Sequence, residues 1–91
     1  MKTRTAWVVW KYQFDIDDGE QTKDIPLMHQ CLYVAMQAGK LCLWVLVNPS
    51  NATVSKGFVL HGTGHPIGDD EDYVGSSLDG QFVWHLFKRK S

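Results

Sequence analysis

The sequence predicts an all-β or predominantly β domain, a small antiparallel sandwich or barrel-like sheet of about six strands. Apolar and polar residues alternate near the start of the chain, and later apolar runs are short and separated by Gly, Asp, Asn and Pro. Four Trp, three Tyr and four Phe in 91 residues favour a packed fold over disorder. A chain of this length has room for one modest core, so we expect residues 1–91 to form a single domain.

The first expected strand covers residues 8–16. Apolar side chains at every second position alternate with more polar ones, which is typical of a strand with one face on a core and one in water. The apolar set is Val8, Trp10, Tyr12, Phe14 and Ile16. Turn residues at 17–20 end the strand, and a short polar segment continues to Pro26.

Residues 27–38 fit both a helix and a strand. Met28, Leu32 and Met36 recur at helical spacing, whereas Leu32, Val34 and Met36 would share a strand face. The continuous apolar run at 41–47, which follows a tight turn at 38–40, decides for a β-hairpin over residues 30–48.

Another strand, residues 57–61, leads into a segment rich in glycine and histidine. The chain then closes with a second hairpin, in which residues 73–78 and 81–87 flank an Asp79-Gly80 turn. The expected register places Leu78 opposite Gln81, Ser76 opposite Val83 and Val74 opposite His85.

The strands at 41–47 and 82–87 are apolar on both faces, so something must cover the second face of each. Self-association, most simply as a two-fold homodimer, would provide that cover. A closed sandwich in which these strands are central explains the pattern equally well.

Charge and composition exclude several classes of protein. Nine Lys and Arg against ten Asp and Glu leave no basic field, so direct nucleic-acid binding is not expected. No signal peptide or membrane span is recognisable, which predicts a cytoplasmic protein that does not contact membranes. In that compartment Cys31 and Cys42 are expected to be small buried hydrophobes rather than a disulfide.

Three stretches of the chain resemble a family of short, uncharacterised proteins encoded by bacteriophages. They are Val9-Trp10-Lys11-Tyr12, the stretch 37–47 that contains Gly-Lys-Leu-Cys-Leu-Trp, and Gly62-Thr63-Gly64-His65-Pro66-Ile67. The resemblance covers most of the chain, and the stretch 27–33 and the basic residues 88–90 depart from it. It implies the host cytoplasm and a small accessory protein that blocks a host defence by binding a defence protein or its nucleotide signal.

The segment 61–65 is the candidate ligand-binding site, with His61, Gly62, Thr63, Gly64 and His65 as its residues. Backbone N–H groups around glycine can point together at an anion, and His and Thr add donors. Two imidazoles fall short of the three protein ligands of a catalytic zinc, so we expect neither metal nor cofactor. The alternative is a specialised turn, in which the glycines only supply unusual backbone angles.

No catalytic residue is assigned, because no serine or cysteine stands at a recognised spacing from a histidine. Candidate partner-binding residues are Trp7, Trp10, Asp69, Asp70, Glu71 and Asp72. The four carboxylates form either an acidic patch or a solvated loop, and residues 88–90 are expected to be a frayed terminus. Strand alternation places Trp7 and Trp10 on opposite faces, so one of them can meet a partner.

These observations predict a protein that acts by binding and is not an enzyme, most directly by inhibiting a host defence protein. The first alternative is a sponge that sequesters a nucleotide-like immune signal in the segment 61–65. The second is a small structural or regulatory phage protein.

Overall fold

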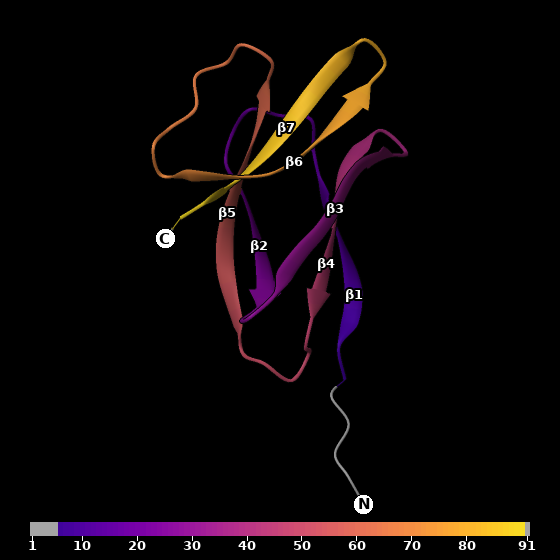
Figure 1. Ribbon diagram of the computed structural model, residues 1–91, viewed down its shortest axis with the longest axis vertical. Coiled ribbons are helices and arrows are strands. Elements are labelled where there is room, and N and C mark those ends of the chain that lie inside the picture. Colours follow the sequence, from indigo (N-terminus) through magenta and orange to yellow (C-terminus); the bar gives the residue numbers. More distant parts are fainter. Residues whose placement is uncertain (1–5, 91) are drawn as a thin grey trace, which may run out of the picture.

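The computed structural model describes residues 6–90 and confirms the all-β prediction (Figure 1). This part of the chain contains no helix and has seven strands, joined by turns and loops. The strands are β1 (Val8–Phe14), β2 (Gln21–Pro26), β3 (Gln30–Gln37), β4 (Lys40–Val47), β5 (Thr53–Gly62), β6 (Glu71–Asp79) and β7 (Phe82–Arg89).

The strands form two antiparallel sheets, so the fold is the expected sandwich and not a closed barrel. The three-stranded sheet has the order β1-β4-β3, and the four-stranded sheet has the order β2-β5-β7-β6. β5 and β6 both run antiparallel to β7, which lies between them. The loop 63–70 must therefore travel back along the length of β7 before β6 can begin.

The core lies between the two sheets. From the three-stranded sheet it receives Phe14 and alternate residues of β4, and from the four-stranded sheet it receives Phe58, Leu60 and Leu86. The rings of Phe14 and Phe58 meet edge to face, with centroids 5.0 Å apart. Burying each such ring contributes about 1.5–3 kcal/mol to folding, so this contact between the sheets is a main source of stability.

The position of two strands accounts for their apolar character on both faces. β4 is the middle strand of its sheet and β7 is an interior strand of the other. On the outer face of β4, Cys42 is fully buried and Trp44 is half-buried against Tyr33. Neighbouring strands thus supply cover within one chain, and self-association stays a prediction. Both cysteines are free thiols; Cys42 is buried as expected, whereas Cys31 is only half-buried.

The first hairpin is confirmed, and the ambiguous residues 30–37 are a strand. Ala38 and Gly39 form its two-residue loop with φ angles of 53° and 78°. Two successive positive φ angles are the signature of a type I′ turn, whose twist matches that of the strands it joins. The first strand is also confirmed but ends at Phe14, before Ile16.

β2 was not expected from the sequence, which was interpreted there as a polar connection. It pairs with β5 from Gln21 to Pro26 and forms an edge of the four-stranded sheet. An edge strand needs few apolar residues, and only Ile25 and Pro26 of β2 are buried. The polar composition of β2 is therefore the reason why the sequence does not predict a strand there.

The second hairpin exists, but the expected register is wrong by two residues. Its loop is Gly80-Gln81, and Asp79 pairs with Phe82, so that Ser76 lies opposite His85. Gly80 has a φ of 60°, which makes it the first loop residue rather than the second. Asp79 stays in the strand, where its carboxylate accepts a hydrogen bond of 3.0 Å from the Trp84 indole N–H.

The two sheets also meet where β3 lies against β6. A Cβ atom on Gly75 would lie 2.6 Å from a methyl carbon of Val34, so a larger residue does not fit there. Nearby, the Met36 N–H donates a hydrogen bond of 3.1 Å to the Ser77 hydroxyl. These contacts fix the β6–β7 hairpin relative to the three-stranded sheet.

Candidate functional site

The glycine-rich segment after β5 is a tight turn formed by residues 62–65. The His65 N–H donates a hydrogen bond of 3.1 Å to the Gly62 carbonyl, and Gly64 has a φ of 93°. A positive φ at the third residue is typical of a type II turn, which requires glycine at that position. The turn that the sequence predicted is present.

The side chain of His65 belongs to the same turn. Its Nδ1 atom accepts a hydrogen bond of 3.1 Å from the Gly62 N–H. A Cβ atom on Gly62 would lie 3.1 Å from His65 Cε1, so the imidazole lies almost directly on the glycine backbone. In the neutral ring the proton is then on Nε2, which leaves that atom as a hydrogen-bond donor.

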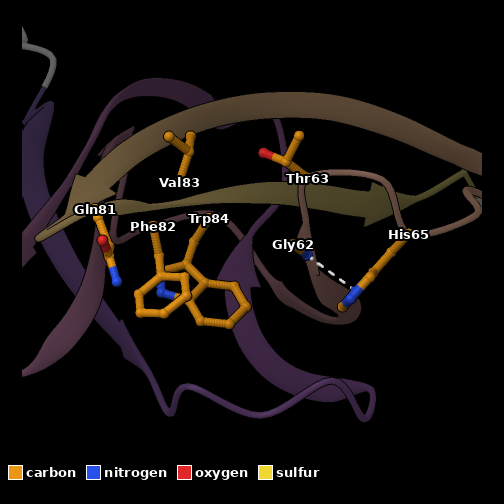
Figure 2. Close-up of a pocket in the computed structure, with 7 residues that line it drawn as sticks. All are labelled: Gly62, Thr63, His65, Gln81, Phe82, Val83 and Trp84. Carbon is orange, nitrogen blue, oxygen red and sulfur yellow. Dashed lines mark hydrogen bonds between the residues drawn. The ribbon is translucent and has the colours of Figure 1, made fainter.

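A pocket of about 510 Å³ adjoins this turn, within the range of about 300–1,000 Å³ that is typical of small-molecule sites. The turn forms one wall and the first residues of β7, with the loop before them, form the other. The lining residues are Gly62, Thr63, His65, Gln81, Phe82, Val83 and Trp84. Figure 2 shows the rings of Phe82 and Trp84 side by side on the same side of the sheet as His65, whereas Val83 and Thr63 point the other way.

Two aromatic rings, those of Phe82 and Trp84, line this pocket, and none of the lining side chains is a lysine, an arginine or a carboxylate. Phe82 is 59% exposed, so its ring is available to a ligand. Trp84 packs against the core and is held by its hydrogen bond to Asp79. The polar side chains on the same side as these two rings are the Gln81 amide and the His65 ring, whereas the Thr63 side chain points away from them. Such a pocket suits a flat, largely apolar ring with a few polar edge groups.

Three of the five residues predicted from the sequence line the pocket. Gly64 shapes the turn without lining it, and His61 lies elsewhere. Sequence reasoning missed the whole second wall, Gln81 to Trp84. The signal that would have found it is the pairing of Gly62 with Trp84, which joins strands far apart in sequence.

His61 instead anchors the loop 63–70 and the start of β6. Its Nε2 atom lies 2.7 Å from a carboxylate oxygen of Glu71, and the two side chains are only 11% and 7% exposed. The other oxygen of Glu71 accepts a hydrogen bond of 3.1 Å from the Gly68 N–H. The rings of His61 and Phe87 also meet edge to face, with centroids 5.4 Å apart. This buried pair closes the loop over the outer face of the sheet.

A chain of hydrogen-bonded side chains crosses the same face and ends at the pocket. Tyr73 Oη lies 2.7 Å from Ser76 Oγ, and Ser76 Oγ lies 2.8 Å from His85 Nδ1. His85 Nε2 lies 3.0 Å from Thr63 Oγ1. The register expected from the sequence separates Ser76 from His85, so this contact could not be predicted. In the structure, β6 and β7 together hold the hydroxyl group of Thr63.

The acidic segment 69–72 is not simply a solvated loop. Glu71 is buried, as described above. Asp70 accepts a hydrogen bond of 2.8 Å from Arg89, and Asp72 lies 3.7 Å from the Lys90 ammonium group. A second hydrogen bond from Arg89, to Glu20, is the main cause of a raised pKa of its guanidinium group. The expectation of a frayed basic terminus is therefore wrong for residues 88–90: Lys88 and Arg89 are the last residues of β7, and Arg89 and Lys90 pair with the acidic segment.

The two tryptophans assigned to a partner surface are both accessible. Trp7 is 41% exposed and Trp10 is 38% exposed. Trp10 lies opposite Val45, on the face of β1 that is turned toward the core, but near the start of the strand. Neither ring is withdrawn into the core.

Within residues 6–90, no three or more His, Cys, Asp or Glu side chains are grouped as a metal site would require. The same residues include no helix that is long and apolar enough to span a membrane. The buried side-chain polar atoms in this part of the chain all have hydrogen-bond partners.

Comparison with known proteins gives a family without an assigned activity. No curated protein and no solved structure matches the chain. The sequence profile of one family, described as a domain of unknown function (DUF7352), matches residues 6–91. Because this match covers nearly the whole chain, the protein belongs to the DUF7352 family.

Proposed function

We propose that the protein acts by binding rather than by catalysis, and that it captures a small planar ligand in the pocket beside the 62–65 turn. The observation that carries this proposal is the pocket itself, which combines two aromatic rings with the glycine–histidine turn. A convex surface at that turn would have favoured a protein target. The resemblance to phage proteins supports a counter-defence role in the host cytoplasm, in which the ligand is a nucleotide-like immune signal.

The chemistry of the pocket favours a nucleobase. Phe82 and Trp84 offer ring faces on which a base can stack, and each such contact contributes about 1–3 kcal/mol. The Gln81 amide can both donate and accept hydrogen bonds at a base edge, and His65 Nε2 can donate one. Aromatic surface with a few polar groups is the usual composition of such sites.

The pocket recognises the base more than the phosphate. No lysine or arginine lines it, and the Gly62 N–H is already occupied by His65. A phosphate group would therefore find little positive charge within the pocket, and it would remain in solvent. We expect a nucleoside to bind about as tightly as its monophosphate.

Isothermal titration calorimetry with the four ribonucleosides, their 5′-monophosphates and cyclic dinucleotides tests this proposal. At least one base should bind, and Phe82→Ala should weaken binding by about 5- to 150-fold, which corresponds to the loss of one stacking contact. Leu78→Ala is the matched control, because Leu78 is an exposed apolar residue of the same hairpin that does not line the pocket. Absence of heat with every probe would contradict the proposal.

The second candidate function is inhibition of a host defence protein through the partner surface. The exposure of Trp7 and Trp10 favours it, whereas the pairing of Asp70, Glu71 and Asp72 with cationic groups or histidine leaves little of an acidic patch. Co-purification of one host protein that is lost on Trp7→Ser but kept on Phe82→Ala would support this candidate over the pocket.

A further inference from the structure

The sandwich has four sheet edges, formed by β1, β2, β3 and β6. An exposed edge strand offers unpaired N–H and C=O groups to other chains, and proteins usually protect it with charges, proline or bulges. Three of these edges have such protection. β2 contains Lys23, Asp24 and Pro26, and the ladders of β3 and β6 are interrupted at Cys31/Tyr33 and Tyr73/Gly75.

β1 has no proline and no interruption of its ladder, and its single charged residue, Lys11, lies in the second half of the strand. Its pairing with β4 is continuous from Val8 to Phe14, and no strand within residues 6–90 pairs with its other side. The side chains at its start are large, apolar and accessible on both faces of the strand. Their exposed fractions are 41% for Trp7, 41% for Val8, 52% for Val9 and 38% for Trp10. This edge is the one that most resembles an interface.

We propose that β1 pairs antiparallel with β1 of a second copy of this chain, across a two-fold axis at Val9. The two three-stranded sheets would then form one continuous six-stranded sheet. A two-fold interface requires a surface that is complementary to itself, and an antiparallel strand pair meets this condition directly. The occupant is thus a second copy, and no segment from another protein is needed.

The charge pattern of β1 disfavours a two-fold axis at Lys11 and favours one in the apolar first half of the strand. Lys11 is the only charged residue among residues 6–14. An axis at Val9 places Val9 opposite Val9, Val8 opposite Trp10, and Trp7 opposite the aliphatic stem of Lys11. An axis at Lys11 would instead place two like charges directly opposite each other, which is destabilising. The apolar first half of β1 is therefore the part that pairs.

This interface differs from the one that the sequence suggested. The apolar pattern of the sequence suggests a dimer that covers the second faces of β4 and β7. In the structure, neighbouring strands of the same chain cover these faces. The β1 interface uses backbone groups at an edge instead, and it leaves the pocket residues of the four-stranded sheet uncovered. It is independent of the proposed ligand.

Sedimentation velocity or light scattering on the full chain tests the proposal. The wild type should have twice the 10.4 kDa mass of one chain. Val9→Lys and Val9→Glu should each be monomeric, because each variant places like charges opposite each other across the axis. An equimolar mixture of the two variants should restore the dimer, which also shows that both variants are folded.

Thr22→Lys, on the exposed edge strand β2, is the matched control and should remain dimeric. A wild-type protein that is monomeric at every concentration overturns the proposal. So does a Val9→Lys variant that remains a dimer, because the interface would then lie elsewhere.

Discussion

His65 and Gly62 are joined by two hydrogen bonds, each 3.1 Å long. In one the His65 backbone N–H donates to the Gly62 carbonyl, and in the other the Gly62 N–H donates to the imidazole Nδ1. The histidine side chain is thus a structural part of the turn, and its ring also forms part of a pocket wall. The sequence is compatible with either a specialised turn or a ligand-binding loop at this segment. In the structure, His65 can take part in both.

Variants at His65 separate these two roles. His65→Ala removes the acceptor of the Gly62 N–H and should lower the free energy of unfolding by about 1 kcal/mol, in addition to weakening ligand binding. His65→Asn retains an acceptor at a similar position and should recover most of that stability without recovering affinity. Thermal denaturation and calorimetry measure the two effects. If His65→Ala binds ligand as the wild type does, the residue is only a turn former.

Breaking the buried contact between His61 and Glu71 should be costly. Glu71→Ala removes the acceptor for both His61 Nε2 and the Gly68 N–H, and loss of two such bonds should cost about 3 kcal/mol. Glu71→Gln keeps one acceptor and should cost less. Urea denaturation gives the values, with Asp69→Ala at the exposed neighbouring position as a control that stays within about 0.5 kcal/mol of wild type. Equal effects of Glu71→Ala and Asp69→Ala would mean that the pair does not hold the loop.

Gly75 and Val34 should show strong energetic coupling. Gly75→Ala places a methyl group 2.6 Å from a Val34 methyl carbon, and such overpacking typically costs about 1–3 kcal/mol. Val34→Ala should restore part of this loss when both substitutions are combined, because it removes the clashing group. A double-mutant cycle measured by urea denaturation quantifies the coupling. Simple additivity of the two effects would contradict the described contact.

The two thiols should differ in reactivity. Burial raises the pKa of the Cys31 thiol, an effect that nearby Lys88 partly offsets, so less thiolate is present at a given pH than in an unfolded chain. Cys31 should react slowly with a disulfide reagent at neutral pH and faster as the pH rises. Cys42 is fully buried and should react only after unfolding. Cys31→Ser assigns the signals, and a rapid reaction of two thiols in the native protein would refute this expectation.

The raised pKa of Cys31 also has a consequence for stability. Since the folded state disfavours the thiolate, ionisation of the unfolded chain begins at lower pH than that of the folded protein. Stability should therefore fall as the pH rises from the ordinary thiol pKa toward the raised one. Cys31→Ser should reduce this part of the alkaline loss of stability in denaturant titrations, and an unchanged loss would show that another group causes it.

The sequence predicted the parts of the fold that depend on local patterns. The alternation in β1 and the Ala38-Gly39 loop are visible within a few residues, and both were correctly interpreted. The register of the second hairpin was not, because an Asp-Gly pair does not determine which two residues form the loop. Here the hydrogen bond from Trp84 keeps Asp79 in the strand.

The candidate site was only half predictable for a related reason. The wall formed by residues 62–65 stands out by composition, whereas the wall at 81–84 is an ordinary apolar strand start. The two come together because β5 pairs with β7, and that pairing depends on the whole sheet. The contact between Ser76 and His85 was missed in the same way, because it required the correct register.

The place of β7 also has a consequence for how the protein is made. β7 is the last strand of its sheet in chain order, but it lies between β5 and β6 and is the element that joins them. Until residues 82–89 have been synthesised, β2 can pair with β5, but β6 has no strand of that sheet to pair with. The four-stranded sheet, the pocket and the hydrogen-bonded chain through His85 therefore form only after β7 has left the exit tunnel, and a chain that stops at Gly80 should not acquire any of them.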